Sequence, residues 1–207
     1  MKSLYFYKKS YIYPKYISSL SQFFNLHSVL KNKAGRNNSG HICVHHKGGG
    51  HKKNYRLLDF KNINKKKRLI SIEYDPNRSA FIGLFYNYSN NNLFFDLYCD
   101  GQSVGSLYKS SENSEDIALG NTVSLVNIPL GTLINSLTLK KGKGFQYLRS
   151  AGSFGKLQKK DLKLFLARIK MPSKKDIFLS LNCTAKIGIV SNISHKNKNI
   201  AKAGRNR

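Results

Sequence analysis

One arginine of this chain lies in a turn whose composition suits anion binding. Arg78 follows an Asp-Pro-Asn turn within the segment EYDPNRSA, residues 73–80. Its guanidinium is a planar fork of donors, which matches a phosphate group or a base edge through two hydrogen bonds. The alternative is an internal ion pair with a nearby carboxylate such as Glu73 or Asp75. Asp75 itself is typical of a turn residue rather than of a general base.

A second arginine, Arg149, precedes the small residues of a Ser-Ala-Gly sequence, which would let a ligand approach the backbone closely. No acidic residue lies within ten positions of Arg149, so a local ion pair is not available to it. Lys141 and Lys143 precede it in a basic glycine-containing loop. We expect Arg149, Ser150, Lys141 and Lys143 to contact phosphate or base groups.

A glycine-rich basic segment, KGGGHKKNYR, occupies Lys47–Arg56. Backbone N–H groups of successive glycines can approach a phosphate closely, although the spacing of a nucleotide-binding P-loop is missing. The absence of acids nearby favours contact with a nucleic-acid backbone over a plain flexible turn. The expected contact residues here are Arg36, Asn37, Asn38, His45, His46, Lys47, Gly48, Gly49, Gly50, His51, Lys52, Lys53 and Arg56.

The same segment brings Cys43 close to three histidines, His45, His46 and His51. A structural zinc site needs four ligands, usually in two closely spaced pairs. Here a single cysteine alternates with histidines and no second cysteine pair is near. The pattern favours histidines that stack on bases or donate to phosphates, so we expect no metal and no other cofactor.

Catalytic patterns are missing from the sequence. The ten acidic residues are scattered and form no close pair in an apolar context, and neither GxSxG nor HExxH occurs. The sequence therefore predicts a binding or structural protein and not an enzyme.

Charge is strongly positive and unevenly distributed. The formal net charge of the 207 residues is +26, residues 1–58 contain no acid, and residues 139–207 carry 18 bases against two acids. Residues 59–138 are nearly neutral, with eight acids and seven bases. Such a chain attracts polyanions, and nucleic acid is the usual partner, ahead of a membrane surface. No run of eighteen apolar residues is present, so we expect no membrane-spanning helix.

The choice of residue types carries a separate signal. Lysine outnumbers arginine 28 to 8, and Asn, Ile, Phe and Tyr are abundant. These residues have A/T-rich codons, which is typical of an organellar genome. The three cysteines have no paired spacing, so we expect reduced thiols rather than disulfides.

The elements that must position these residues are predicted to be short β-strands. Alternating apolar residues separated by turn residues every eight to twelve positions favour two small barrels over a parallel α/β sheet. The expected strands are the runs His41–His46 and Tyr55–Phe60, segments within residues 68–75, 79–87, 92–101 and 121–139, Leu162–Lys170, and Ile177–Val190 with a break near Gly188.

The first 33 residues are rich in Tyr and Lys and contain no Arg, which does not favour a cleaved mitochondrial import signal. Two alternatives remain open: an arm packed against RNA or a neighbouring protein, and a frayed terminus. Residues that could line one face of a short helix are Leu20, Phe23, Phe24, Leu26 and Leu30.

Taken in order, several segments are similar to the universal ribosomal protein L2 family of the large subunit. They are AGRNNSGHI, HHKGGGHKKNYRLLDFK, IEYDPNRSAFIGL, GNTVSLVNIPLGTLINSLTLKKGKG, LRSAGS and NCTAKIGIVSN. The resemblance implies a mostly β chain, in which an extended basic N-terminal arm precedes an OB-like barrel and an SH3-like barrel. The expected boundaries are 1–65 for the arm, 66–118 and 119–195 for the barrels, and 196–207 for the start of a C-terminal tail.

The resemblance also implies a function, that of a structural constituent of the large ribosomal subunit. Such a protein would bind large-subunit rRNA and other ribosomal proteins, and support subunit assembly and the peptidyl transferase region. Arg78 and Arg149 match arginines that contact rRNA in this family. The alternative is a free OB-type protein that binds single-stranded nucleic acid on exposed aromatic side chains.

The end of the chain departs from the family pattern. The sequence stops at KAGRNR, where the family continues into a glycine-rich tail whose histidine is associated with the peptidyl transferase neighbourhood. We expect Lys202, Arg205 and Arg207 to contact RNA and a separate polypeptide to supply the tail, with loss of the tail as the alternative. We expect a mitochondrial ribosome, with a relict plastid or a bacterial cytoplasm as alternatives.

Overall fold

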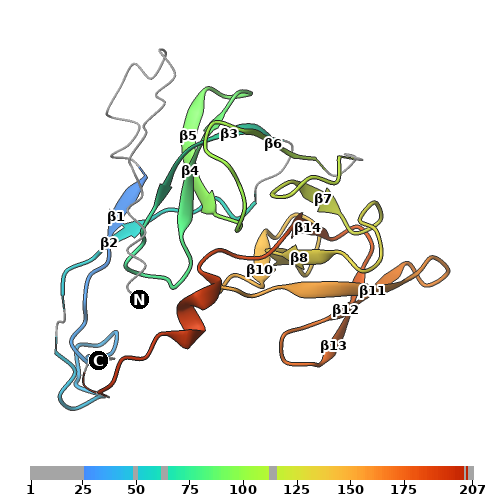
Figure 1. The fold of residues 1–207 in the computed structure, drawn as a ribbon. Helices are drawn as coiled ribbons and strands as arrows, with labels where there is room; N and C mark the ends of the chain where they lie inside the picture. Colours follow the sequence, from blue (N-terminus) through green and yellow to red (C-terminus); the bar gives the residue numbers. More distant parts are fainter. Residues whose placement is uncertain (1–25, 49–50, 62–64, 112–115, 203, 205–207) are drawn as a thin grey trace.

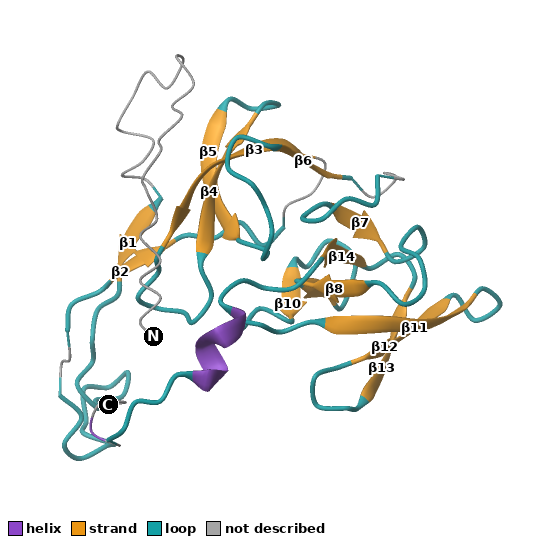
Figure 2. Cartoon of the chain, in the orientation of Figure 1, coloured by secondary structure: helices purple, strands orange, loops and turns teal. Residues whose placement is uncertain are grey.

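Strands joined by turns make up almost all of the regular structure (Figures 1 and 2). A computed structural model describes residues 26–48, 51–61, 65–111, 116–202 and 204. Its strands are β1 (His27–Val29), β2 (Asn54–Arg56), β3 (Lys65–Glu73), β4 (Ile82–Asn87), β5 (Asn92–Leu97), β6 (Leu107–Ser110), β7 (Thr122–Ser124), β8 (Leu133–Asn135), β9 (Leu137–Thr138), β10 (Phe145–Tyr147), β11 (Gly155–Asp161), β12 (Leu166–Lys170), β13 (Asp176–Ser180) and β14 (Thr184–Ile187). A 3-10 helix, η1 (Ile193–Asn197), follows β14.

One sheet runs through both halves of the chain in the order β13-β12-β11-β8-β14-β7-β6-β3-β4-β5. Neighbours pair antiparallel except β6 and β7, which pair in parallel at Ser110 and Thr122. Strands β3–β6 form the first unit and β7–β14 the second. This architecture confirms the prediction of a mostly β chain with an OB-like barrel followed by an SH3-like barrel, whereas the residue boundaries of the domains stay a prediction.

Each unit has its own apolar core, which follows from the alternation of apolar residues along its strands. The first core lies on the two faces of β3–β5, around Phe85 and Phe95. The second gathers residues of β7–β14 around Ile134 and Leu157. A small third cluster, centred on Leu97 and Val190, joins the two units.

Three buried charged side chains also connect the two units. Lys67 on β3 and Lys186 on β14 both reach the Asp96 carboxylate on β5, with Nζ–Oδ2 distances of 2.6 and 2.9 Å. The side chains of Lys67 and Lys186 are fully buried, and that of Asp96 is 1% exposed. Lys186 also donates to the Leu97 carbonyl, and the Lys67 ammonium lies 5.0 Å from the centre of the Phe85 ring. We call Lys67, Asp96 and Lys186 the inter-barrel triad.

The triad holds two cations against one anion, and burial affects each member differently. Burial lowers the pKa of Lys67 to about 8, against the attraction of Asp96. Burial alone would raise the pKa of Asp96, but the two ammonium groups outweigh it and lower this pKa to about 2. Burial likewise opposes the charged form of Lys186, but Asp96 and weaker neighbours outweigh it and raise its pKa. The triad therefore carries a net positive charge in the interior at neutral pH.

Several strand and helix predictions are wrong in detail. Residues 41–46 form turns and one isolated bridge instead of a strand, and residues 27–29 form β1 where a helix was expected. The helix residues Leu20, Phe23 and Phe24 lie outside the described residues. The expected strand from 177 to 190 is two strands separated by a turn at residues 181–183. Strand β11 was missed because its polar side chains obscure the alternation.

Candidate nucleic-acid interface

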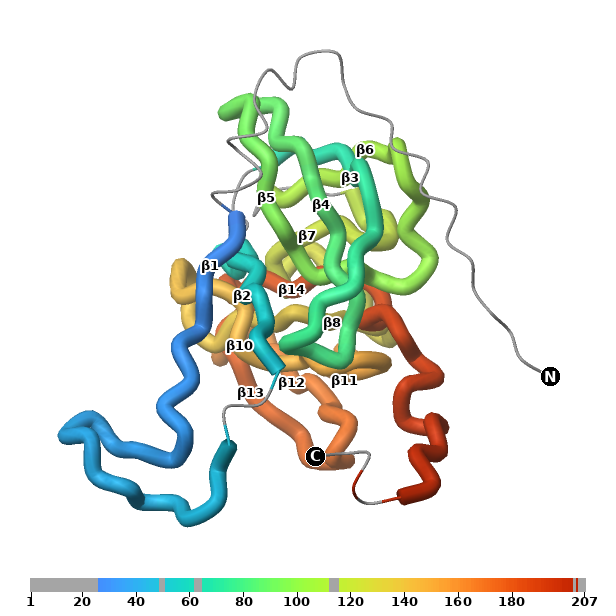
Figure 3. The backbone as a smooth tube through the Cα atoms, turned by 90° about the vertical axis from the view of Figure 1, so that its left-hand side faces the viewer, coloured from blue at the N-terminus to red at the C-terminus, as the bar shows by residue number. Residues whose placement is uncertain are grey.

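The basic arm is a two-stranded ribbon with a long loop. Strand β1 pairs antiparallel with β2, with His27 opposite Arg56, and the loop between them projects away from both barrels (Figure 3). Gly35 lets this loop fold back on itself, because its carbonyl accepts bonds from the N–H groups of Cys43 and Val44. Its φ is +78°, and a Cβ there would lie 2.4 Å from the Val44 carbonyl oxygen, so only glycine fits.

Nearly all predicted contact residues of the arm point into solvent. Exposed residues among them are Arg36, Asn37, Asn38, His45, His46, Lys47, Gly48, His51, Lys52 and Lys53. Gly49 and Gly50 lie outside the described residues. Arg56 is half-buried on β2, and its Nε is a buried donor without a hydrogen-bond partner among the described residues. The arm therefore presents its cations to the outside, as a polyanion would require.

Two of these residues also hold the loop in shape. The Asn37 side-chain oxygen accepts bonds from the N–H groups of Ser39 and His41, each at 2.9 Å. The Asn38 side-chain oxygen accepts a 2.6 Å bond from the Lys33 ammonium. Both asparagine oxygens therefore accept hydrogen bonds inside the loop, and contact of these two residues with RNA stays a prediction.

A hollow lies between the two sides of the arm and the turn that carries Arg78. Its volume is about 670 Å³, and it is lined by residues 29–33, residues 51–53 and Asn77. The Asn77 amide donates a 2.8 Å bond to the Asn54 carbonyl on β2, which attaches the turn to the arm. Lys31 and Lys33 line this hollow but were not predicted. The sequence signal for them was the acid-free composition of the whole segment.

Arg78 forms an ion pair with Asp75, so the alternative of an internal ion pair is correct for this arginine. Asp75 is fully buried, and its Oδ2 accepts a 2.5 Å bond from Arg78 Nε. Its Oδ1 accepts a 2.9 Å bond from the Asn77 N–H, so Asp75 is also the expected turn residue. The guanidinium lies 6.0 Å from the Tyr55 ring centre and its side chain is 18% exposed. Because the ion pair uses Nε, it orients the remaining N–H groups of the guanidinium.

Arg149 is exposed and makes no ion pair among the described residues. Its guanidinium lies 5.0 Å from the centre of the Phe60 ring, which supports it from the arm side. The following turn is closed by Ser153, whose N–H and hydroxyl both donate to the Ser150 carbonyl. Gly152 has φ +65° and packs against the backbone of Ile193, so a side chain would be tight there. Rigid placement of this kind suits a directed anion contact.

The two arginine turns meet in space although 70 residues separate them in sequence. The Ala151 N–H donates a 3.3 Å bond to the Ser79 hydroxyl, and the Asn192 amide donates a 2.7 Å bond to the Ser79 carbonyl. Ser79 and Asn192 are connecting residues that sequence reasoning did not find, because neither belongs to a charged motif. The arm, the Arg78 turn and the Arg149 turn therefore form one continuous basic region.

The remaining predicted residues are two lysines before β10 and three basic residues near the end of the chain. Lys141 and Lys143 are exposed in the turn before β10, next to Phe60, whose carbonyl accepts a bond from the Phe145 N–H. Lys202 is exposed beyond η1. Arg205 and Arg207 lie outside the described residues.

Within the described ranges, no group of three or more His, Cys, Asp or Glu side chains could hold a metal ion. Cys43 is exposed, Cys99 and Cys183 are buried, and all three are free thiols. Among the same residues, no helix is long and apolar enough to cross a membrane.

Two family profiles match most of the chain. Residues 24–110 match "Ribosomal Proteins L2, RNA binding N-terminal domain", and residues 118–207 match "Ribosomal Proteins L2, C-terminal domain". "Large ribosomal subunit protein uL2" of Endomicrobium trichonymphae is 40% identical over 193 residues, which cover 92% of this chain and 69% of that protein. "Large ribosomal subunit protein uL2m" of Reclinomonas americana is 46% identical over 176 residues, covering 84% and 62%.

The chain thus spans about two thirds of the length of these relatives. Neither match gives support to the expectation that a separate polypeptide supplies a C-terminal tail.

Proposed function

Because the chain belongs to the ribosomal protein L2 family, we propose that it is a structural constituent of the large ribosomal subunit and binds large-subunit rRNA. The family profile that matches residues 24–110 is described as an RNA-binding domain. The net charge of +26 supports a polyanionic partner. The exposed cations of the arm are available for such a partner.

The observation that carries this proposal is the junction of the two arginine turns at Ser79. It places Arg78 and Arg149 in one region, although they belong to different barrels. One folded RNA segment can therefore contact both barrels and the arm at the same time. The protein acts by fixing the relative positions of the RNA strands it contacts, and its arm and turns supply the phosphate contacts.

Two finer parts of the proposal have different support, the first from the family and the second mainly from residue choice. We assign the protein to subunit assembly and to the support of the peptidyl transferase region, together with other ribosomal proteins as partners. We place it in a mitochondrial ribosome, which the relative named uL2m and the A/T-rich residue choice support. The bacterial relative is of similar identity, so the assignment to the organelle rests mainly on residue choice.

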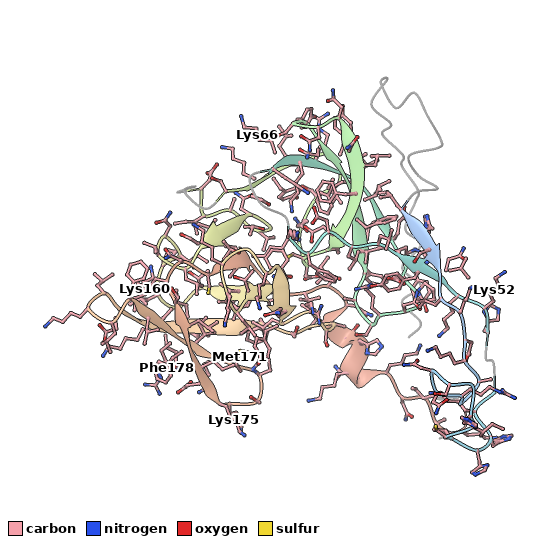
Figure 4. All side chains as sticks on the ribbon, turned by 180° about the vertical axis from the view of Figure 1, so that it is seen from behind. Lys52, Lys66, Lys160, Met171, Lys175 and Phe178 are labelled. Atoms are coloured by element: carbon pink, nitrogen blue, oxygen red, sulfur yellow. The ribbon has the colours of Figure 1, made fainter. Side chains whose placement is uncertain are left out.

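The test is the affinity of the full chain for a large-subunit rRNA transcript, measured at one fixed salt concentration. Arg149→Ala should weaken binding by about 1–3 kcal/mol, because it removes a directed contact without disturbing an internal ion pair. Lys66→Ala is the matched control, since it removes an exposed cation at the start of β3 (labelled in Figure 4), whereas the Arg78 turn follows the other end of that strand.

Arg78→Ala should weaken binding as well, but it also leaves the buried Asp75 carboxylate without its cation. Its thermal unfolding must therefore be measured beside its affinity. Unchanged affinity of both arginine variants, with intact folding, would remove the arginine turns from the RNA site. Equal losses of rRNA affinity in Arg149→Ala and Lys66→Ala would show that Arg149 contributes only through its charge and not through a directed contact.

A further inference from the structure

The far end of the second barrel exposes a group of large apolar side chains. Leu162, Leu164 and Phe165 lie in the loop between β11 and β12, and Phe178 lies on β13. Leu162, Leu164 and Phe178 are 73, 69 and 62% exposed. We call these four residues the hairpin patch. Figures 1 and 4 show that it lies at the opposite end of the molecule from the basic arm.

The hairpin patch borders a shallow groove on the outer face of the sheet. In the register of β11–β13, Lys159 lies opposite Arg168 and Arg168 lies opposite Phe178. The groove has a volume of about 160 Å³ and is lined by these three residues together with Asp161, Leu164 and Leu166. An apolar side chain of a partner could therefore fit between Leu164 and Phe178 with cations at its sides.

Strand β13 ends the sheet among the described residues, so its outer edge offers unpaired backbone groups. The Met171 N–H donates to the Lys175 carbonyl, and the Leu181 N–H donates to the Phe165 carbonyl. These two bonds identify the hydrogen-bonded pairs of the register, and the pair of Ile169 with Ile177 belongs to the same set. Hydrogen-bonded and non-hydrogen-bonded pairs alternate along an antiparallel ladder, so Phe178, which lies opposite Arg168, stands in a non-hydrogen-bonded pair. Its N–H and carbonyl therefore point away from β12, toward the open edge.

The charge around the hairpin patch is positive. Its two acids are already engaged: Asp161 accepts the N–H groups of Lys163 and Leu164, and Asp176 accepts from Arg168. The exposed cations on β11, β12 and the turns that connect β11–β13 are Lys156, Lys159, Lys163, Arg168, Lys170, Lys174 and Lys175, of which Lys159 and Arg168 line the groove itself. A partner that neutralises this rim must be acidic.

We propose that the hairpin patch and the open edge of β13 bind an extended, acidic and apolar segment of another protein. The segment adds as a strand beside β13, places apolar side chains on Phe178 and Leu164, and directs carboxylates to the surrounding lysines. RNA fits less well, because two of the most exposed side chains are leucines, which offer no ring on which a base can stack. The groove at Leu164 and Phe178 does not include the arginine turns, whereas Lys175, Asp176 and Ile177 at the start of β13 line a pocket together with Arg149 and Ser150.

The test uses the full chain and a labelled, soluble peptide of alternating Glu and Val, with fluorescence anisotropy as the measurement. The peptide should bind saturably, and Phe178→Ser should weaken binding about tenfold or more. Leu107→Ser is the matched control, because Leu107 is 60% exposed on β6 in the other barrel. A Lys–Val peptide and an oligouridylate are measured in parallel.

Absence of saturable binding, or an equal loss in Leu107→Ser, would overturn the proposal. Binding of the oligouridylate that is lost in Phe178→Ser would show that the surface takes RNA instead, and would also overturn it. Affinity for the rRNA transcript is measured on the same variants and should not change in Phe178→Ser. Failure of the peptide site and failure of rRNA binding are therefore distinguishable.

Discussion

Arg78 and Arg149 share a sequence pattern but not an environment. Both follow or precede turn residues, yet Arg78 is anchored by the fully buried Asp75, whereas Arg149 rests on the Phe60 ring and stays exposed. Substitution of the two arginines therefore measures different quantities. Removing Arg149 reports mainly on RNA contact, while removing Arg78 also leaves a carboxylate desolvated and unpaired.

The inter-barrel triad makes a prediction about single side chains. Asp96→Asn leaves two buried ammonium groups without their anion, so it should destabilise the protein by about 3–5 kcal/mol. Lys67→Met should change stability by less than about 1 kcal/mol, because it leaves one cation facing one anion. Urea unfolding at neutral pH measures the stability of both variants. Similar losses of stability in the two variants would show that the second buried cation does not destabilise the natural protein.

At the scale of elements, the loop of the arm depends on backbone conformation more than on packing. Gly35 brings the two ends of a tight sub-loop together, and Asn37 closes the turn within it. The predicted cations are therefore displayed from a shaped loop. Neither the positive φ of Gly35 nor its closeness to Val44 is visible as a charge or hydropathy pattern.

Two glycines of this loop provide an element-scale prediction. Gly35→Ala should distort the loop, because its φ is +78° and the new Cβ would lie 2.4 Å from the Val44 carbonyl oxygen. Gly40→Ala is the control: its φ is +84°, but nothing lies within 4 Å of the new Cβ, so only the conformational cost of about 1 kcal/mol applies.

The measurements are rRNA affinity and hydrogen exchange at the Cys43 and Val44 amides, which donate to the Gly35 carbonyl. We expect faster exchange and weaker binding in Gly35→Ala than in Gly40→Ala. Equal behaviour of the two variants would mean that the loop shape does not matter for binding.

At the scale of the whole molecule, a parallel strand pair, a small apolar cluster and the inter-barrel triad unite the barrels. The arginine turns meet on one side of this junction, and the hairpin patch lies at the far end of the second barrel. A junction held by these contacts keeps the two surfaces at a fixed separation.

The free energy of unfolding of the protein should depend on pH, because the members of the triad titrate. The sign of that dependence follows from the pKa of Lys67, which is about 8 in the folded chain against an ordinary value of 10.5. Between these values the unfolded chain binds more protons, so stability should rise with pH by up to about 1.4 kcal/mol per unit. Asp96 affects stability at acidic pH, since the stabilisation that it contributes is lost as pH falls from 3.8 toward about 2. Lys186, whose pKa is raised, loses its contribution only above 10.5.

The measurement is urea unfolding from pH 7.5 to 10 in the natural chain and in Lys67→Met. Cys99 and Tyr108 are other titratable groups near the triad, and both remain in the variant, so the difference between the two curves reports on Lys67 together with its coupling to Cys99. We expect the difference to change in favour of the natural chain as pH rises. Parallel curves would show that Lys67 keeps its proton throughout this range.

The sequence by itself determined the mostly β architecture, the two barrels, the ribosomal family and the two arginine turns. The architecture depends on the alternation of apolar residues along β3–β5, and the Arg78 turn depends on the turn chemistry around Asp75. The family was indicated by the resemblance of motifs such as EYDPNRSA and LRSAGS, taken in order along the chain. Strand β11 was missed because its polar side chains weakened the alternation, whereas the turn after β13 was missed because the alternation continues through it, with Leu181 and Cys183 both buried.

Only the tertiary structure decided which distant residues meet. Ser79 joins Ala151, Lys186 reaches Asp96 across the barrel junction, and Phe178 becomes exposed at a sheet edge although its strand reads as ordinary. The physical reason is that contact and exposure depend on pairing between strands far apart in the chain. Periodicity within one strand specifies which face is apolar, but not whether a neighbour covers that face.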